Sequence, residues 1–276
     1  MTVRHIIRSI REATEPLYGP HEAEMIARMV VCKRLRYNLS QMVAHYDDEA
    51  EIADLEPIVA ELKSGRPVQY VLGEAEFCEM EFEVEEGVLI PRPETEELVY
   101  HIVETTKRGA RILDIGTGSG AIAIALSKLI EEAEVVAVDI SREALAIARR
   151  NAERMGADVE FTEADALGDL SHLGKFDIIV SNPPYIPQSD IVDMRQNVID
   201  FEPHTALFVP DDDPLCFYRA TAKNGATMLR EGGSIWFEIY EKLGKELCAM
   251  MSAMGYSRNE IIEDSNLKPR MVWSRR

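Results

Sequence analysis

The spacing of apolar residues divides the chain into two parts. Up to about residue 62, apolar side chains recur every three or four positions, as they do around Ile6, Ile26 and Ile58, which is the spacing of one buried helix face. Turn-forming residues separate this region into four or five short helices, at Pro16, Gly19, Pro20, Ser40, Asp47 and Asp48. We therefore expect a small helical bundle over residues 1–66. Its methionine-containing stripes are interpreted as core rather than as a cofactor site.

A short extended segment is expected next. Residues 68–73 look extended, and apolar residues from Phe77 to Val84 alternate with acidic ones before Gly87. Alternation of this kind is typical of a strand with one buried face. Residues 67–90 are therefore predicted to form a β-hairpin linker.

A Pro-Arg-Pro turn at residues 91–93 precedes a helix that is expected to start near Thr95. Because the two prolines stiffen the chain, this turn would hold Leu89 and Ile90 against a pocket. A plain interdomain linker explains the same residues, and both interpretations stay open.

From residue 111 onward, short β-branched runs alternate with helical segments. This order is the signature of an α/β domain with a parallel sheet covered by helices, and we assign it to residues 91–276. Strands are expected at residues 111–115, 134–138, 159–162, 176–180 and 234–239, helices at 121–130, 215–229 and 241–254, and a hairpin-like pair at 261–262 and 271–273.

Composition narrows the class of protein. The 276 residues are 46% hydrophobic and carry a formal net charge of −19. The chain also lacks the clustered Lys and Arg with which nucleic-acid-binding proteins neutralise phosphates, so direct nucleic-acid binding is not expected. No apolar run reaches membrane-spanning length and the N-terminus is unlike a signal peptide, so we expect a cytoplasmic protein without a membrane partner. The four cysteines and six histidines are scattered, so no disulfide framework and no metal site are predicted.

Three strand ends carry residues that suit a nucleoside ligand. Residues 116–120 form a Gly-x-Gly-x-Gly turn, which lets main chain approach a ligand but departs from the Gly-x-Gly-x-x-Gly of dinucleotide enzymes. Asp139 ends the next strand, where its carboxylate can accept from two ribose hydroxyls. Asp165 and Ala166 follow the third strand and could meet an adenine edge, although Asp165 could also be only a turn residue.

A fourth strand ends in Asn182-Pro183-Pro184-Tyr185. The prolines hold the backbone extended and cannot donate hydrogen bonds. The Asn182 side-chain oxygen and the Pro183 carbonyl are therefore two fixed acceptors that could bind both hydrogens of one NH2 group, with Tyr185 packed beside it. Such residues also simply end strands, so the turn by itself leaves function open.

The motifs together resemble class I S-adenosylmethionine-dependent methyltransferases. More narrowly, the chain is similar to the protein-(glutamine-N5) methyltransferases that modify peptide chain release factors. The narrower resemblance spans almost the whole chain and rests on five motifs: Gln69-Tyr70-x-x-Gly73, residues 89–96 (Leu-Ile-Pro-Arg-Pro-Glu-Thr-Glu), residues 116–121, residues 182–186, and Glu202-Pro203 with Phe217-Tyr218-Arg219.

The resemblance implies a helical N-terminal domain that docks the substrate, a β-hairpin linker and a seven-stranded Rossmann-like sheet. It implies methyl transfer from S-adenosylmethionine, with S-adenosylhomocysteine as product, to the glutamine of a Gly-Gly-Gln loop in class I release factors, which tunes translation termination. The implied cofactor-binding residues are Asp114, Gly116, Thr117, Gly118, Ser119, Gly120, Asp139, Ile140, Asp165, Ala166 and Asn182. The implied catalytic residues are Asn182, Pro183, Pro184 and Tyr185, which with Leu89 also bind the substrate.

Two departures from the family pattern concern the docking side. Glu79 stands where relatives tend to have glycine, and residues 209–214 replace a glycine-rich loop. A glutamine methyltransferase of a ribosomal protein and an adenine-N6 methyltransferase of nucleic acid remain alternatives. A non-catalytic cofactor-binding module would not need the turn at Asn182, and the glycine spacing disfavours an NAD-dependent oxidoreductase.

Overall fold

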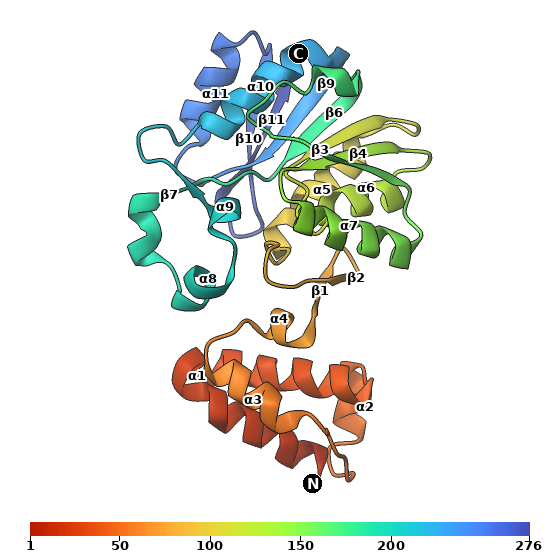
Figure 1. Cartoon of the computed structure of the whole chain (residues 1–276), viewed down its shortest axis with the longest axis vertical. Coiled ribbons are helices and arrows are strands. Elements are labelled where there is room, and N and C mark those ends of the chain that lie inside the picture. Colours follow the sequence, from red (N-terminus) through yellow and green to blue (C-terminus); the bar gives the residue numbers. More distant parts are fainter. The chain divides into compact units, whose positions relative to one another are not determined.

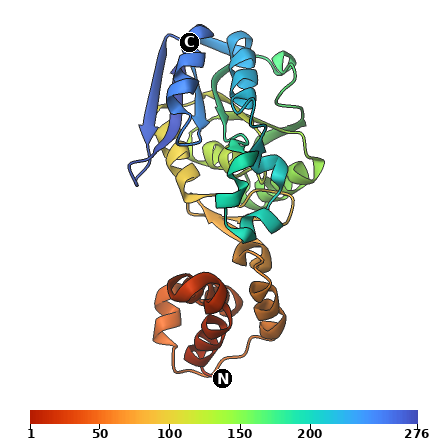
Figure 2. The same ribbon diagram turned by 90° about the vertical axis from the view of Figure 1, so that its left-hand side faces the viewer.

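The computed structural model describes residues 1–276, which form two compact units. The smaller unit comprises residues 1–74 and 195–201, and the larger comprises residues 75–194 and 202–276. Figures 1 and 2 trace the elements of both units.

The smaller unit is helical, as predicted. Its helices are α1 (Val3–Leu35), α2 (Leu39–Ala44), α3 (Leu55–Lys63), α4 (Val68–Leu72) and α8 (Gln196–Phe201). Helices α1 to α4 enclose a cluster of buried side chains that includes Ile6, Val30 and Leu62. Of the two predicted breaks in the first helix, only the one at Gly19 (φ 78°) is present, and the helix continues through Pro16.

Two other expectations for this unit are wrong. Ser40 lies inside α2, because Asn38 and Gln41 exchange side-chain and main-chain hydrogen bonds and start the helix earlier. Residues 68–72 are helical rather than extended, and Gly73 ends this helix in the left-handed conformation. A short apolar run fits either structure, and here burial of Tyr70 and Val68 favours the helix.

The larger unit contains the predicted seven-stranded sheet. Its order is β10-β11-β9-β6-β3-β4-β5, and only β11 runs antiparallel to its neighbours. The strands are β3 (Arg111–Ile115), β4 (Glu134–Asp139), β5 (Val159–Glu163), β6 (Phe176–Ser181), β9 (Leu229–Glu238), β10 (Arg258–Glu263) and β11 (Pro269–Arg275).

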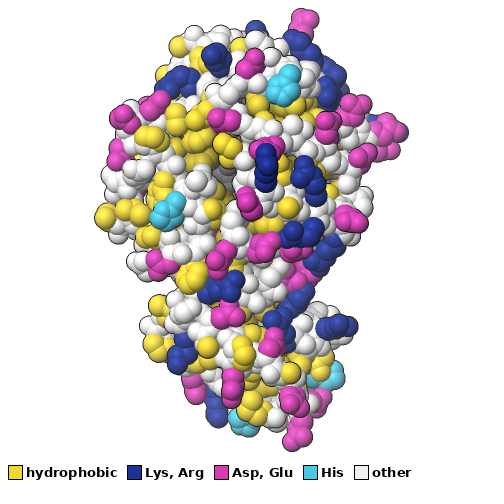
Figure 3. Space-filling model, in the orientation of Figure 1, with side chains coloured by type: hydrophobic (Ala, Val, Ile, Leu, Met, Phe, Trp, Pro, Cys, Tyr) yellow, Lys and Arg dark blue, Asp and Glu magenta, His cyan; other side chains and the backbone are white.

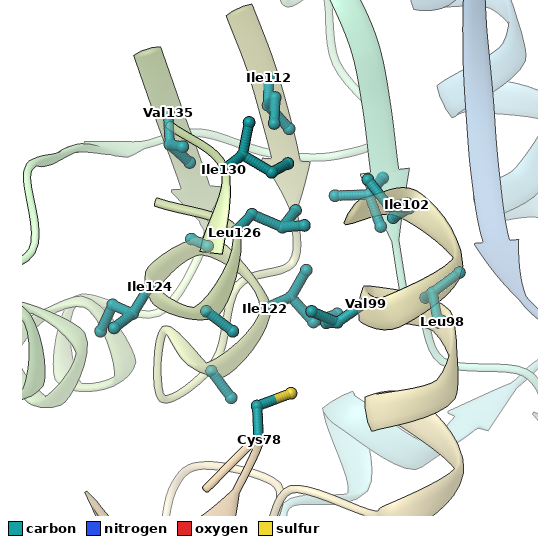
Figure 4. Packing of buried hydrophobic residues seen from close by; sticks show 14 of the residues in the cluster. Cys78, Leu98, Val99, Ile102, Ile112, Ile122, Ile124, Leu126, Ile130 and Val135 are labelled. Carbon is teal, nitrogen blue, oxygen red and sulfur yellow. The ribbon is translucent and has the colours of Figure 1, made fainter. Parts of the chain in front are cut away.

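Helices cover both faces of this sheet. One face packs on α5 (Pro93–Thr105), α6 (Ala121–Leu129) and α7 (Arg142–Met155), and the other on α10 (Cys216–Met228) and α11 (Gly244–Ala253). Figure 4 shows the first face, where Ile122 and Leu126 of α6 and Val99 of α5 lie against side chains of the strands. The remaining short elements are η1 (Ser171–Leu173), β7 (Ile186–Pro187), η2 (Gln188–Asp193), α9 (His204–Leu207) and β8 (Phe208–Val209).

A tight hairpin precedes the sheet, formed by β1 (Glu74–Phe77) and β2 (Met80–Glu83). Its two turn residues, Cys78 and Glu79, both have positive φ, 49° and 60°. This is the backbone of a two-residue turn that favours glycine, so Glu79 stands in a conformation that suits glycine better than a residue with a side chain.

None of the helices combines the length and apolar character needed to cross a membrane.

Candidate active site

A cavity of about 680 Å³ lies in the larger unit. Its wall includes residues that directly follow or end four neighbouring strands: Gly116 after β3, Asp139 in β4, Ala164 after β5 and Asn182 after β6. The carboxyl edge of a parallel sheet is where open α/β folds bind ligands. Thr95 of α5 and Phe217 of α10 close the cavity from the two helical layers.

Most of the residues predicted for the site meet in this wall. They are Leu89, Gly116, Thr117, Gly118, Ser119, Asp139, Ile140, Asp165, Ala166, Asn182, Pro183 and Pro184. Three predicted residues, Asp114, Gly120 and Tyr185, are not part of the wall; Gly120 N–H donates to the main-chain oxygen of Thr117, which is part of it.

The glycine turn is held by the carboxylate of Asp139. Gly118 N–H donates to Asp139 Oδ2 at 2.8 Å, and Ser141 N–H donates to Oδ1 at 2.9 Å. A carboxylate oxygen has two acceptor positions, so each oxygen of Asp139 keeps one for a ligand. The turn itself requires glycine, since Gly116 and Gly118 have φ of 80° and 54°.

Asp114 supports the turn from below. It is fully buried and accepts from Thr117 Oγ1 at 2.6 Å, whereas its Oδ1 has no hydrogen-bond partner. Burial, and secondarily the negative charge of Asp139, raise the pKa of Asp114 to about 7, against the opposing effect of the Thr117 hydrogen bond. Asp114 thus holds the turn through Thr117 and does not line the cavity itself.

Asp165 lies in the cavity wall and also forms a local turn. It lines the cavity together with Ala166, and its Oδ1 accepts from Leu167 N–H at 2.9 Å in a local turn. Gly168 N–H adds a bond to the Asp165 carbonyl at 2.9 Å. The turn fixes the main chain that faces the cavity.

The Asn182 side chain is held by Thr95 and Glu238, to which the sequence assigned no role at the site. Its Nδ2 donates to Thr95 Oγ1 at 3.3 Å, and Thr95 Oγ1 donates to Glu238 Oε2 at 2.6 Å. Tyr185 OH donates to the other oxygen, Oε1, at 3.1 Å. Burial raises the pKa of Glu238, and its hydrogen bonds with Thr95 and Tyr185 oppose the shift.

Tyr185 lies behind the wall. Its ring stacks on Tyr240 with centroids 6.3 Å apart, and burial raises its pKa well above the usual range. Leu89 lines the cavity, whereas Tyr185 does not.

The segment that carries Leu89 is fixed by Glu202. Ile90 N–H donates to Glu202 Oε2 at 3.3 Å, and Arg92 Nη2 donates to Oε1 at 2.5 Å. The Glu202 side chain is 1% exposed and that of Arg92 is 34% exposed, so this is a partly buried ion pair with an added main-chain bond. It places Leu89 in the wall, while Ile90 is buried outside it rather than facing the cavity as expected.

Asn151 of α7 links the glycine turn to the hairpin. Its Nδ2 donates to Ser119 O and to Glu83 O, each at 3.0 Å, and its Oδ1 accepts from Glu83 N–H at 2.7 Å. The fully buried amide is thus satisfied at both ends. Arg150 adds ion pairs with Glu83 and Glu85.

One signal could have found Glu238. A carboxylate within the otherwise apolar run 235–239 breaks the pattern of a buried strand. Thr95 and Asn151 carry no comparable signal, because a hydroxyl or an amide on a helix is ordinary until its neighbours are known.

Charge at the surface is mixed. Figure 3 shows Lys and Arg interspersed with Asp and Glu on the face that it draws, and no group of His, Cys, Asp and Glu is arranged to hold a metal ion.

The fold and this cavity define a class I methyltransferase, and comparisons with known proteins agree. Residues 93–201 match the family model "Methyltransferase small domain" and residues 9–73 match "PrmC N-terminal domain". The catalytic domain of human Mettl16 in complex with an RNA hairpin superposes with a TM-score of 0.55 at 15% identity, over 70% of this chain and 74% of that one. A Thermus thermophilus 16S rRNA N2 G1207 methyltransferase in complex with AdoMet and guanosine gives 0.54 at 18% identity, over 74% and 49%.

Curated relatives define the family more closely. A release factor glutamine methyltransferase from Bacteroides thetaiotaomicron is 41% identical over 278 residues, which cover 99% of this chain and 100% of the relative. One from Streptococcus pneumoniae is 45% identical over 198 residues, which cover 71% and 70%. The chain belongs to the release factor glutamine methyltransferase family, whose members are S-adenosylmethionine-dependent enzymes.

Proposed function

We propose that the protein transfers a methyl group to the side-chain amide nitrogen of the glutamine in the Gly-Gly-Gln loop of peptide chain release factors. Family membership supports release factors as the substrate class. The observation that carries the choice of a carboxamide acceptor is the Asn182 turn, since Asn182, Pro183 and Pro184 all line the cavity.

The cavity fits S-adenosylmethionine by the chemistry of its wall. The turn at residues 116–120 offers main chain without side-chain obstruction for the methionine part, and Asp139 keeps one free acceptor position on each oxygen for the ribose hydroxyls. Asp165 and Ala166, with Ile140 on the same wall, suit the adenine. When bound, this cofactor supplies an activated methyl group on a sulfonium centre.

For the acceptor, the residues of this chain orient a poor nucleophile. An amide nitrogen shares its lone pair with its carbonyl, so activation by position matters more than a strong base. Asn182 Oδ1 and the Pro183 carbonyl accept the two N–H hydrogens and leave the nitrogen aimed at the methyl donor. Pro184 keeps this turn rigid, Leu89 excludes water, and the proton released from the alkylated nitrogen passes to solvent.

We assign substrate docking to the helical residues 1–66 and the connection to residues 67–90, with chemistry in residues 91–276. A cytoplasmic setting follows from release factors as substrates and stays a prediction.

One assay tests the proposed function. The purified protein is incubated with labelled S-adenosylmethionine and, separately, a release factor, ribosomal proteins and DNA or RNA. Label is expected in the release factor and absent when its Gly-Gly-Gln glutamine is changed to alanine. Equal label in that variant would refute the glutamine, and label only in ribosomal protein or nucleic acid would favour an alternative acceptor.

Asn182→Ala separates acceptor binding from cofactor binding. Removing the side-chain acceptor is expected to lower kcat at least about 100-fold, comparable to loss of one preorganised donor or acceptor at a reacting group, with the Kd for S-adenosylmethionine changed by about threefold or less. Steady-state kinetics and calorimetry measure both. Equal losses in kcat and affinity would remove Asn182 from the acceptor role.

A further inference from the structure

Behind the Asn182 turn, three side chains form one continuous hydrogen-bonded chain. It runs from Asn182 Nδ2 to Thr95 Oγ1 at 3.3 Å, and from Thr95 Oγ1 to Glu238 Oε2 at 2.6 Å. Thr95 and Glu238 are 4% and 2% exposed. These residues lie on three different elements, since α5 carries Thr95, the loop after β6 carries Asn182, and β9 ends at Glu238.

The direction of these bonds follows from the chemistry of the groups. The hydroxyls of Thr95 and Tyr185, one at each oxygen, and the charge of Arg270 favour the ionised carboxylate of Glu238 and oppose the upward pKa shift that burial causes. With its carboxylate ionised, Glu238 only accepts, so the single hydroxyl hydrogen of Thr95 goes to Glu238. The Thr95 oxygen then has only lone pairs left for Asn182. The end of the Asn182 amide that faces Thr95 must therefore be the NH2 group.

This direction decides what Asn182 presents on its other side. An asparagine amide is nearly symmetric in shape, and a rotation of about 180° exchanges its oxygen and nitrogen. With the NH2 group bound to Thr95, the oxygen Oδ1 is left to accept from a ligand. In the rotated state, an NH2 group would face the NH2 of a carboxamide, and two donors would meet.

We propose that Glu238, acting through Thr95, is a positioning residue that fixes the Asn182 amide with its oxygen as the acceptor for the substrate NH2. The proposal rests on the proposed function, because the orientation of the Asn182 amide matters only if an N–H group is bound there.

The surroundings of Glu238 hold its carboxylate in place. Tyr185 OH donates to the second oxygen at 3.1 Å, and Tyr218 OH donates to the Glu238 main-chain oxygen at 3.2 Å. In the sheet, β9 pairs with β6, with Ser181 opposite Phe237. Glu238 and Asn182 are therefore each the residue directly after the last paired position of these two neighbouring strands. Tyr185 thereby gains a role that does not require it to line the cavity.

A matched pair of substitutions at Thr95 tests the proposal in the full-length protein. Thr95→Val keeps the shape but removes the hydroxyl, so both orientations of the Asn182 amide become accessible. We expect kcat with the release factor to fall about tenfold, the effect of losing one orienting hydrogen bond, while the Kd for S-adenosylmethionine stays within about twofold. Thr95→Ser restores the hydroxyl and is expected to recover most of the lost rate.

Thr105→Val is the control on the same helix. Its hydroxyl donates to the helix carbonyls of His101 and Ile102, so this variant reports the cost of replacing a threonine of α5 without touching the Asn182 network. Full activity of Thr95→Val would overturn the proposal. So would a loss in Thr95→Ser as large as that in Thr95→Val, because the hydroxyl would then not be what matters.

Glu238→Gln gives a second, independent result. A glutamine can offer either its oxygen or its NH2 group to Thr95, so the hydrogen bonds from Asn182 through Thr95 can then run in either direction. We expect the kcat of Glu238→Gln to lie between that of wild type and that of Thr95→Val, again with little change in cofactor affinity. Unchanged kcat would overturn a role for the carboxylate.

The orientation of Asn182 is also read without catalysis. In protein labelled with ¹⁵N-asparagine, the side-chain NH2 signals of Asn182, assigned by their loss in Asn182→Asp, are expected to shift in Thr95→Val and to stay in Thr95→Ser. If wild-type protein methylated no release factor, the proposed function would fail, and these signals would still confirm or overturn the orientation. Identical signals in all three proteins would overturn it.

Discussion

Gly120 is expected to be irreplaceable for reasons of both backbone and packing. It begins α6 with φ of 83°, and a Cβ atom there would lie 3.0 Å from Ala148 Cβ and 3.0 Å from Ile124 Cδ1. The Ala148 Cα, which cannot move without α7, would be 3.3 Å away. Gly120→Ala therefore combines a left-handed conformation, which costs about 1–2 kcal/mol for a residue with a side chain, with overpacking, which costs about 1–3 kcal/mol.

A matched glycine separates the two costs. Gly156 ends α7 with φ of 60°, and nothing lies within 4 Å of a Cβ built there. Gly156→Ala is therefore expected to have the conformational cost without the cost of overpacking. Since alanine also reduces the freedom of the unfolded chain by about 0.4–1 kcal/mol, we expect net losses of about 1 kcal/mol for Gly156→Ala and about 2–4 kcal/mol for Gly120→Ala.

Thermal unfolding measures the difference. For a unit of this size, 1 kcal/mol corresponds to about 2–4 °C, so Gly120→Ala should lower the Tm by about 5–15 °C and Gly156→Ala by about 2–4 °C. Equal shifts for the two variants would refute the packing part of the reasoning, because only that part distinguishes the sites.

Three further predictions concern single residues. Asp139→Ala should weaken S-adenosylmethionine binding at least about tenfold, because both the ribose acceptors and the Gly118 bond are lost; calorimetry showing an unchanged Kd would contradict it. For Asp114, whose folded-state pKa is raised to about 7, the stability from the protonated form is present below about pH 4 and lost as pH rises through 7. Asp114→Asn should therefore gain stability relative to wild type as pH rises from 5 to 8, by up to about 4 kcal/mol at about 1.4 kcal/mol per pKa unit. This gain would be measured as a widening difference in Tm, and a pH-independent difference would argue against it. Glu79→Gly should raise the Tm, since it relieves a left-handed residue (φ 60°) at a net gain of about 0.5–1 kcal/mol; a lower Tm in the unfolding scan would show that the turn is not strained.

The predicted elements that failed are those whose pattern admits two structures. Residues 68–72 are apolar in a way that fits a strand or a short helix, and packing within the bundle decided for the helix. By contrast, the strands that end in Asp139 and Asn182 are short, β-branched and followed by unmistakable turns, and the structure has both of them.

The sequence by itself determined the succession of strands and helices, the glycine turn and the acceptor-rich turn at Asn182, because periodicity and local turn chemistry are properties of neighbouring residues. Only the tertiary structure decided that Thr95 and Glu238 lie behind Asn182, and that Asn151 joins the glycine turn to the hairpin. The partners in these hydrogen bonds are separated by 32 to 143 positions along the chain. Such contacts depend on strand order and helix packing, which no local pattern contains.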